Sequence, residues 1–131
     1  MRSKRVLIAE DNRDGAESLR RLVEAWGHQA EVTYDGQAAV HRATSFRPDV
    51  AVMDINMPVM DGYVAAKLLR GAHEQLMLIA MTGAPMDETR SRARGAGFHH
   101  YFCKPVEVAD LRRLLDSDTP EHLLPGFRMH D

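Results

Sequence analysis

Short apolar runs alternate with amphipathic segments along this 131-residue chain. A continuous apolar run is typical of a strand that is buried on both faces, and a run that alternates with polar residues indicates a half-exposed edge strand. The fully apolar runs predict inner strands, and the shorter or alternating ones predict edge strands. The predicted strands are residues 6–9, 29–34, 50–53, 76–81 and 101–103, with 29–34 and 101–103 at the edges.

Apolar residues spaced three and four apart predict amphipathic helices after each of these strands. Asn12, Asp35 and Asp87 are expected where helices begin, because their side chains can accept hydrogen bonds from the first helical turn. The predicted helices are residues 13–26, a helix from Gly36 through Ala43, residues 63–71, residues 88–95 and a last helix from about Glu107.

The repeated order of strand and helix predicts a parallel sheet with helices on both faces. The wholly apolar strands are the first, third and fourth, which are the inner strands of a doubly wound sheet of order 2-1-3-4-5. The expected fold class is therefore α/β, a doubly wound (βα)5 flavodoxin-like fold over residues 1–116. Residues 117–131 show no period and are expected to form a C-terminal tail, docked loosely by Leu123, Leu124 and Phe127.

Composition narrows the functional classes. A net charge of −2 argues against direct binding to nucleic acid or to an anionic membrane surface. No apolar run approaches the ~18 residues that span a bilayer, and the N-terminal apolar stretch is too short for a signal peptide. The single cysteine, Cys103, excludes an internal disulfide and fits a reducing compartment, so a cytoplasmic location is expected.

Polar side chains follow the inner strands and the last strand of the predicted sheet. Glu10 and Asp11 follow the first strand, Asp54 the third, Thr82 the fourth and Lys104 the fifth. Because the carboxyl ends of parallel strands share one edge, these side chains are expected to meet there. Three carboxylates that lie close together need compensating charge, which Mg²⁺ and a lysine can supply.

Such a cluster suits phosphoryl transfer. The Asp54 carboxylate can attack phosphorus and form an aspartyl phosphate. The transferred group then needs positive charge and hydrogen-bond donors around its equatorial oxygens, for which Mg²⁺, Lys104 and Thr82 are available. Each of these residues is ordinary by itself, since an acid at a strand end is often a helix cap. The prediction depends on their convergence.

Four motifs resemble the receiver domain of bacterial two-component response regulators. They are VLIAEDN at 6–12, VMDINMPVMDG at 52–62, AMTG at 80–83 and YFCKP at 101–105. The resemblance covers residues 4 to about 116. It implies a signalling domain rather than an enzyme, one that promotes its own phosphorylation and dephosphorylation. The implied donor is the phosphohistidine of a histidine kinase or histidine phosphotransfer domain.

The resemblance also implies a metal site. Asp54 would be the phosphoacceptor, and Glu10 and Asp11 would bind Mg²⁺ together with Asp54 and the backbone carbonyl of Asn56. Glu10 stands at a position where aspartate is also common, so it is expected to reach the metal through a water molecule.

Switch residues are implied in the same way. Thr82 would be the switch hydroxyl, Lys104 the phosphoryl-binding lysine and Tyr101 the switch aromatic, although packing in an edge strand is an alternative role for Tyr101. A downstream protein would bind the face formed by the fourth helix, the fifth strand and the fifth helix. The neighbouring His99 and His100 are expected to be solvated loop residues.

Two other functions fit part of the pattern. A Mg²⁺-dependent phosphohydrolase of the haloacid dehalogenase type also uses an aspartyl phosphate, but it needs a second acid where this chain has Asn56, and a substrate cap. A phosphorylation-independent interaction module would be favoured by the loss of a site residue, and none is lost. Within the favoured class, a single-domain regulator resembling the chemotaxis regulator and a receiver of a hybrid histidine kinase both stay open.

Overall fold

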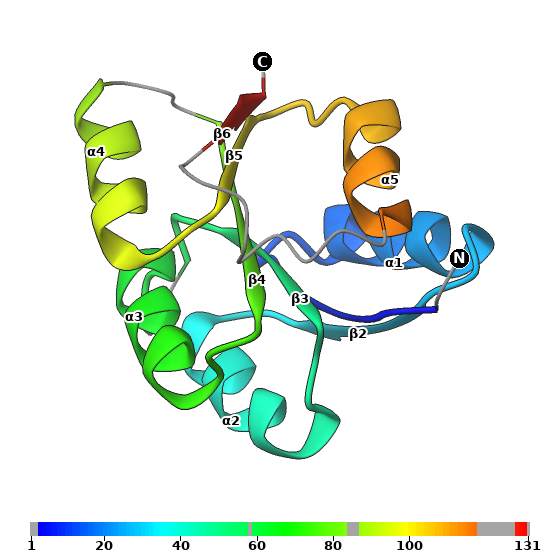
Figure 1. Ribbon diagram of the computed structural model, residues 1–131, viewed down its shortest axis with the longest axis horizontal. Coiled ribbons are helices and arrows are strands. Elements are labelled where there is room, and N and C mark those ends of the chain that lie inside the picture. Colours follow the sequence, from blue (N-terminus) through cyan, green and yellow to red (C-terminus); the bar gives the residue numbers. More distant parts are fainter. Residues whose placement is uncertain (1–2, 58, 84–86, 118–127, 131) are drawn as a thin grey trace.

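The computed structural model is a parallel sheet between two layers of helices (Figure 1). It describes residues 3–57, 59–83, 87–117 and 128–130. The strands are β1 (Arg5–Ala9), β2 (Gln29–Thr33), β3 (Val50–Asp54), β4 (Met77–Thr82), β5 (His100–Cys103) and β6 (Arg128–His130). The helices are α1 (Arg13–Ala25), α2 (Gly36–Phe46), α3 (Gly62–Ala72), α4 (Asp87–Ala96) and α5 (Val108–Asp116).

The strand order is β2-β1-β3-β4-β5-β6, so the order predicted for the first five strands is confirmed. The prediction that the fifth strand is an edge is wrong, because β6 pairs with β5 in parallel and places Met129 opposite Tyr101. A strand of three residues is too short to give a recognisable period. Leu123, Leu124 and Phe127 lie outside the described residues.

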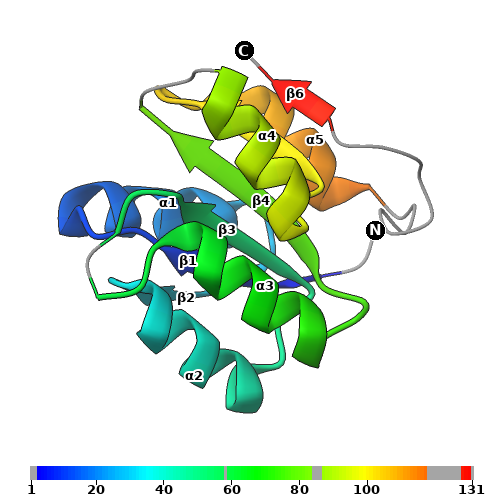
Figure 2. The same cartoon turned by 90° about the vertical axis from the view of Figure 1, so that its left-hand side faces the viewer.

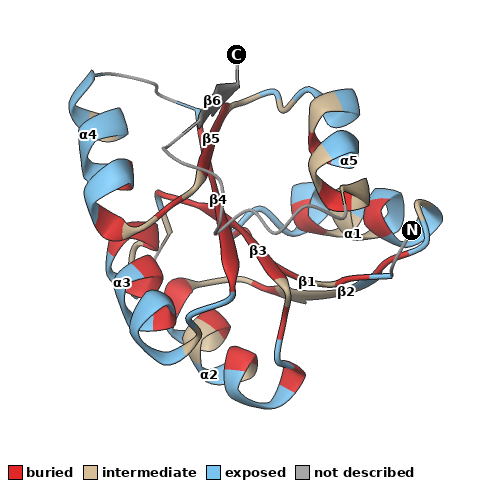
Figure 3. Ribbon diagram, in the orientation of Figure 1, coloured by how far each residue is buried: buried red, intermediate tan, exposed pale blue. Residues whose placement is uncertain are grey.

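Alternate residues of β1, β3, β4 and β5 supply two separate cores. Leu7 and Met53 pack with α2, α3 and α4 on one face, and Ile8 and Val52 pack with α1 and α5 on the other (Figure 2). Every residue of β3 and β4 is buried, which explains their continuous apolar sequences (Figure 3). Among the described helices, none has the length and apolar character that crossing a membrane requires.

Side chains just before the helices satisfy the N–H groups of the first turn. Asn12 caps α1 and Asp35 caps α2, as predicted, and Asp61 caps α3, which the sequence had indicated only as part of a turn. Asp87 is the first residue of α4 and therefore lies within the helix, where its negative charge favours the helix N-terminus.

His99 and His100 differ from the prediction of solvated loop residues. His100 begins β5 and is buried. The Nδ1 atom of His99 accepts a hydrogen bond from the Leu78 N–H at 3.0 Å, and its Nε2 atom lies 2.8 Å from the Arg70 guanidinium. Both histidines are therefore part of the junction between β4 and β5.

A buried polar cluster that the sequence did not indicate joins the start of β1 to the end of α5. The His28 side chain is 1% exposed. Its Nδ1 atom accepts a hydrogen bond from the Lys4 N–H at 3.0 Å, and its Nε2 atom lies 3.0 Å from Asp116 Oδ1. The Lys4 ammonium donates to the carbonyls of Leu114 and Ser117 at 3.4 and 2.5 Å. These contacts fix the chain where it leaves α5.

We expect His28→Ala to lower the free energy of unfolding by about 1–3 kcal/mol, because it removes the acceptor of a buried N–H group. His41 is exposed on α2 and provides the matched control, with an expected change within about 0.5 kcal/mol. Urea unfolding of both variants measures the difference. Equal losses of stability in the two variants would show that the hydrogen bonds of His28 do not stabilise the fold measurably.

Candidate functional site

The carboxyl ends of the inner strands lie side by side, as predicted from their sequences. The register places Asp54 opposite Met81, and Thr82 opposite Cys103. The backbone N–H of Lys104 donates to the Thr82 carbonyl at 2.7 Å, which ties the end of β5 to the end of β4. The peptide bond between Lys104 and the next residue is cis.

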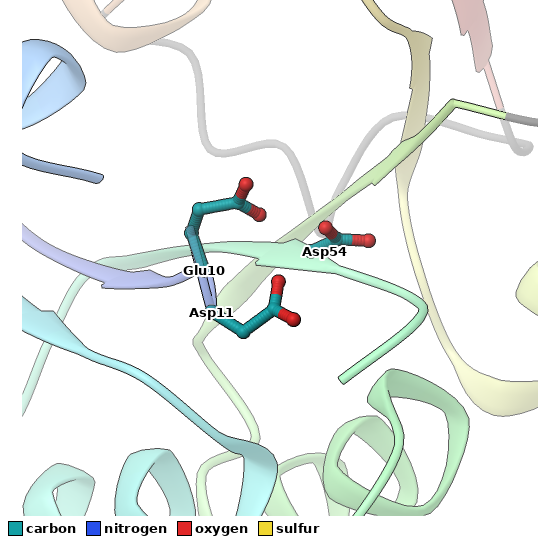
Figure 4. Close-up of side chains that lie close together, drawn as sticks. All are labelled: Glu10, Asp11 and Asp54. Atoms are coloured by element: carbon teal, nitrogen blue, oxygen red, sulfur yellow. The ribbon is translucent and has the colours of Figure 1, made fainter. Parts of the chain in front are cut away.

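Three carboxylates converge at this edge (Figure 4). Each of Glu10, Asp11 and Asp54 has an oxygen atom within 4.8 Å of an oxygen of the other two. Asp54 and Glu10 are both 6% exposed, whereas Asp11 is exposed. The cluster is therefore buried on one side and open to solvent on the other, and its donor atoms are oxygens, the ligands that Mg²⁺ prefers.

The Lys104 side chain is the counter-ion of the two buried acids. Its Nζ atom lies 2.7 Å from Asp54 Oδ2 and 3.0 and 3.1 Å from the two Glu10 oxygens. Burial disfavours the charged ammonium, but the hydrogen bonds to Asp54 and Glu10 outweigh it and raise the pKa of Lys104. The Asn56 N–H donates to the second Asp54 oxygen at 3.0 Å, so both oxygens of Asp54 accept hydrogen bonds.

Burial at this crowded edge changes the acidity of Glu10. Burial raises the pKa of the Glu10 carboxyl to about 7, the neighbouring Asp54 adds to the rise, and Lys104 opposes it. In the absence of a metal, part of the protein therefore carries a proton on Glu10 at neutral pH, which reduces the repulsion between the two buried carboxylates.

The two residues expected to act as switches are fully buried. Thr82 ends β4, and Tyr101 belongs to the same buried core as Ala93 of α4. Burial raises the pKa of the Tyr101 phenol, and a hydrogen bond with Thr82 opposes that rise. The aromatic ring of Tyr101 thus lies inside the protein.

Gly62 is a positioning residue that the sequence indicated only as part of a turn. Its N–H donates to the Ile55 carbonyl at 2.8 Å, so the chain after Asp54 folds back onto the end of β3. A Cβ at Gly62 would lie 2.8 Å from the Asp54 carbonyl oxygen, closer than carbon and oxygen atoms pack. Only glycine allows this approach, and no sequence period reveals it.

A cleft of about 450 Å³ opens beside the site, between α1 and the chain that follows β5. Glu10 and Lys104 form part of its polar lining. Leu19, Met81 and Val106 contribute apolar walls. The cleft therefore offers an apolar surface that leads to the charged groups of the site.

The sequence model of one protein family, the response regulator receiver domain, matches residues 6–116. This chain is a member of that family. Response regulator MprA of Mycobacterium tuberculosis (strain ATCC 25618 / H37Rv) is 34% identical over 131 residues, which cover 97% of this chain and 57% of the relative. The chain spans about half the length of the curated relatives that it matches.

Solved receiver domains share the fold. The receiver domain of the Francisella response regulator 1452 superposes with a TM-score of 0.80 and 25% identity, covering 87% of this chain and 94% of that one. A CheY-like receiver domain from Methanospirillum hungatei JF-1 shows the same fold with a TM-score of 0.81 and 23% identity, covering 88% and 95%. The prediction of a two-component receiver, a signalling domain, is confirmed.

We expect Gly62→Ala to destabilise the receiver by at least about 1 kcal/mol, because the new methyl group displaces the backbone of β3 or α3. Gly71, in the last turn of the same helix, has no atom within 4 Å of the position that a Cβ would take. Gly71→Ala should therefore leave stability unchanged or raise it by up to about 1 kcal/mol. Thermal or urea unfolding compares the two, and similar effects would contradict the close approach at Gly62.

Glu10 is expected to titrate near pH 7 in protein treated with EDTA. Its folded pKa of about 7 lies above the ordinary glutamate value of 4.5, so between these values the folded state holds a proton that the unfolded chain has lost. The contribution of Glu10 to stability therefore falls as the pH rises through this range. Glu10→Gln lacks that titration, so its stability relative to the unchanged chain should increase from low to high pH.

Two measurements check this expectation, namely urea unfolding at several pH values and carboxyl ¹³C NMR of Glu10. A Glu10 resonance that titrates wholly below about pH 5, near the ordinary glutamate value, would contradict the conclusion that burial raises the pKa of Glu10.

Proposed function

We propose that this receiver is the phosphoacceptor switch of a two-component phosphorelay and that Asp54 takes a phosphoryl group from a phosphohistidine. The main support is the contact of 2.7 Å between Lys104 Nζ and Asp54 Oδ2, which puts a positive charge where the phosphoryl oxygens would arrive. The proposed receiver comprises residues 1–116, with residues 117–131 as a C-terminal tail.

In the proposed reaction an Asp54 carboxylate oxygen attacks phosphorus, and the bond between phosphorus and the imidazole nitrogen breaks. The imidazole leaves with the electron pair, and Asp54 becomes an acyl phosphate. Lys104 then holds one phosphoryl oxygen. The Asn56 N–H, which now bonds Asp54 at 3.0 Å, keeps the carboxylate oriented during attack.

Glu10, Asp11 and Asp54 fit a magnesium site, because their oxygens lie within 4.8 Å of one another and Asp11 faces solvent. The Asn56 backbone carbonyl is the proposed fourth protein ligand. Bound Mg²⁺ would supply charge that neutralises these acids and the developing phosphoryl group. Metal binding requires Glu10 to lose its proton, so affinity for Mg²⁺ rises with pH.

The proposed donor is a histidine kinase or a histidine phosphotransfer domain. The cleft of about 450 Å³ between α1 and the chain after β5 offers apolar surface for such a partner and leads to Lys104. The receiver is proposed to act in the cytoplasm, without direct contact with nucleic acid or membrane.

The proposed output depends on Thr82 and Tyr101. A phosphoryl group on Asp54 adds negative charge and strong acceptor oxygens, which attract the Thr82 hydroxyl. Because Thr82 also contacts the Tyr101 hydroxyl, its movement changes the packing of the Tyr101 ring beneath α4. The face formed by α4, β5 and α5 then changes shape and binds a downstream protein.

The phosphohydrolase alternative has weaker support. Two residues after Asp54, where such an enzyme needs an acid, the chain has Asn56, whose side chain is exposed and whose backbone N–H binds Asp54. Residue 56 therefore supplies no general acid beside the Asp54 carboxylate.

We expect the unchanged chain to take up phosphate from acetyl phosphate in the presence of Mg²⁺, as a modification that hydroxylamine removes. Asp54→Asn should lose at least about 99% of this uptake, because an amide is not a nucleophile for phosphorus. Asp14→Asn, an exposed acid in the first turn of α1, is the matched control and should retain full uptake. Equal uptake by Asp54→Asn and the unchanged chain would refute the assignment.

A further inference from the structure

Helix α4 is anchored to the core in its second half only. Its buried residues are Ala93 and Ala96, two small side chains, and Phe98 just after the helix is buried as well. Residues 87–92, all of which the structure describes, are exposed or half-buried. Because apolar stabilisation scales with the area that is buried, the core contributes little to holding the first half of α4.

A contact from α3 holds that first half. The two helices lie side by side (Figure 1, Figure 2). The guanidinium of Arg92 lies over the ring of Tyr63, at the start of α3, with its Cζ atom 3.9 Å from the ring centroid. The Tyr63 hydroxyl donates to the carbonyl of Thr89, about one turn earlier in α4, at 3.4 Å. We call Tyr63, Thr89 and Arg92 the α3–α4 latch.

The ring contact is the stronger part of the α3–α4 latch. The hydrogen bond of 3.4 Å is long and therefore weak. A guanidinium within ~6 Å of an aromatic face is attracted by the negative charge density of that face. Tyr63 is only 7% exposed, so little water screens the contact from the side of the ring. Burial raises the pKa of the Tyr63 phenol, and the nearby charge of Arg92 opposes that rise.

The α3–α4 latch lies near Tyr101, on which the proposed output depends. Tyr63 and Tyr101 belong to the same core, together with Ala93 of α4. Burial raises the pKa of Tyr101 most, and the neighbouring Cys103 and Tyr63 add to the rise, so the two phenols lie within electrostatic reach of each other. Because protein interiors are close-packed, a change in the packing of the Tyr101 ring must displace Tyr63 or α4.

We propose that the α3–α4 latch holds the first half of α4 in its resting position and that it opens when the protein switches. The event that opens it is the arrival of a phosphoryl group on Asp54, so this step rests on the proposed function. Movement of the Tyr101 ring separates the Arg92 guanidinium from the Tyr63 ring. The first half of α4 then takes a new position, while the second half stays anchored through Ala93, Ala96 and Phe98.

The test removes the charge of Arg92 in the full chain. Arg92→Gln keeps the helix propensity of the position and takes away the cation over the ring. Arg90→Gln makes the same change of charge in the same helix, where the guanidinium instead lies 3.6 Å from the Asp87 carboxylate, and is the matched control. Tyr63→Leu removes the ring and keeps an apolar side chain. Thermal unfolding checks that every variant is folded.

Hydrogen exchange without any phosphodonor measures how often the first half of α4 opens. The amides of residues 93–96 are the reporters, because in an α-helix they bond to the carbonyls of residues 89–92. Arg92→Gln should speed their exchange about two- to fivefold, the factor that one such ring contact supplies, and Arg90→Gln should leave it unchanged. In the Tyr63→Leu background Arg92→Gln should add nothing, because its partner is gone. The amides of β3 should exchange equally in all variants, since the opening is local.

Beryllofluoride tests whether the α3–α4 latch belongs to the switch. This ion adds to a carboxylate oxygen and forms a tetrahedral group that resembles a phosphoryl group, and ¹⁹F NMR measures the bound fraction in the presence of Mg²⁺. Arg92→Gln should bind beryllofluoride about two- to fivefold more tightly than Arg90→Gln and the unchanged chain. The reason is that the resting arrangement, which binding must replace, has become less stable by that factor.

Three results would overturn the proposal. Equal exchange of residues 93–96 in Arg92→Gln and Arg90→Gln would show that the contact does not hold α4. An effect of Arg92→Gln that persists beside Tyr63→Leu would show that Arg92 acts elsewhere. Equal affinities for beryllofluoride would show that the latch is not part of the switch. Failure of the unchanged chain to bind beryllofluoride would instead refute the proposed function, and the exchange measurements would still decide whether the latch holds α4.

Discussion

The ammonium group of Lys104 holds the site together, because it is the positive charge between two buried carboxylates. Glu10 comes from the end of β1, Asp54 from the end of β3 and Lys104 from the end of β5, so the contacts of 2.7 to 3.1 Å exist only when the sheet is complete. Like charges this close would otherwise repel one another or take up protons. Burial and the neighbouring Asp54 raise the pKa of Glu10 to about 7, although Lys104 opposes that rise.

The fold, and the meeting of three acids at one edge of the sheet, could be predicted because both follow from local sequence. The continuous apolar runs of β1, β3 and β4 indicate burial on both faces, and burial on both faces places these strands inside the sheet. Once the sheet is parallel, the residue after each strand must lie at one edge, which brings Glu10, Asp11 and Asp54 together. No long-range information beyond strand order is needed for that step.

The features that escaped prediction depend on contacts between distant segments. His28 and His100 look like ordinary polar residues in the sequence, and they are buried because Asp116 and the β4–β5 junction lie next to them. Gly62 is required because a Cβ at this position would lie 2.8 Å from the Asp54 carbonyl oxygen, which belongs to β3. Strand β6 has only three residues, too few to show a recognisable alternation of apolar and polar positions. Only its pairing with β5 identifies it as a strand.

The exposure of the three charged side chains also indicates which of them can adapt to the phosphoryl transfer proposed for Asp54. The Lys104 side chain is 32% exposed, whereas those of Glu10 and Asp54 are 8% and 9% exposed. A lysine is a point charge on a flexible stem with three donors, so it can exchange one acceptor for another without moving the backbone. The carboxylates are confined by the strand ends and by the Asn56 N–H. In the proposed reaction, a phosphoryl group on Asp54 would therefore draw the ammonium of Lys104 away from Glu10, while the ends of β1 and β3 keep their positions.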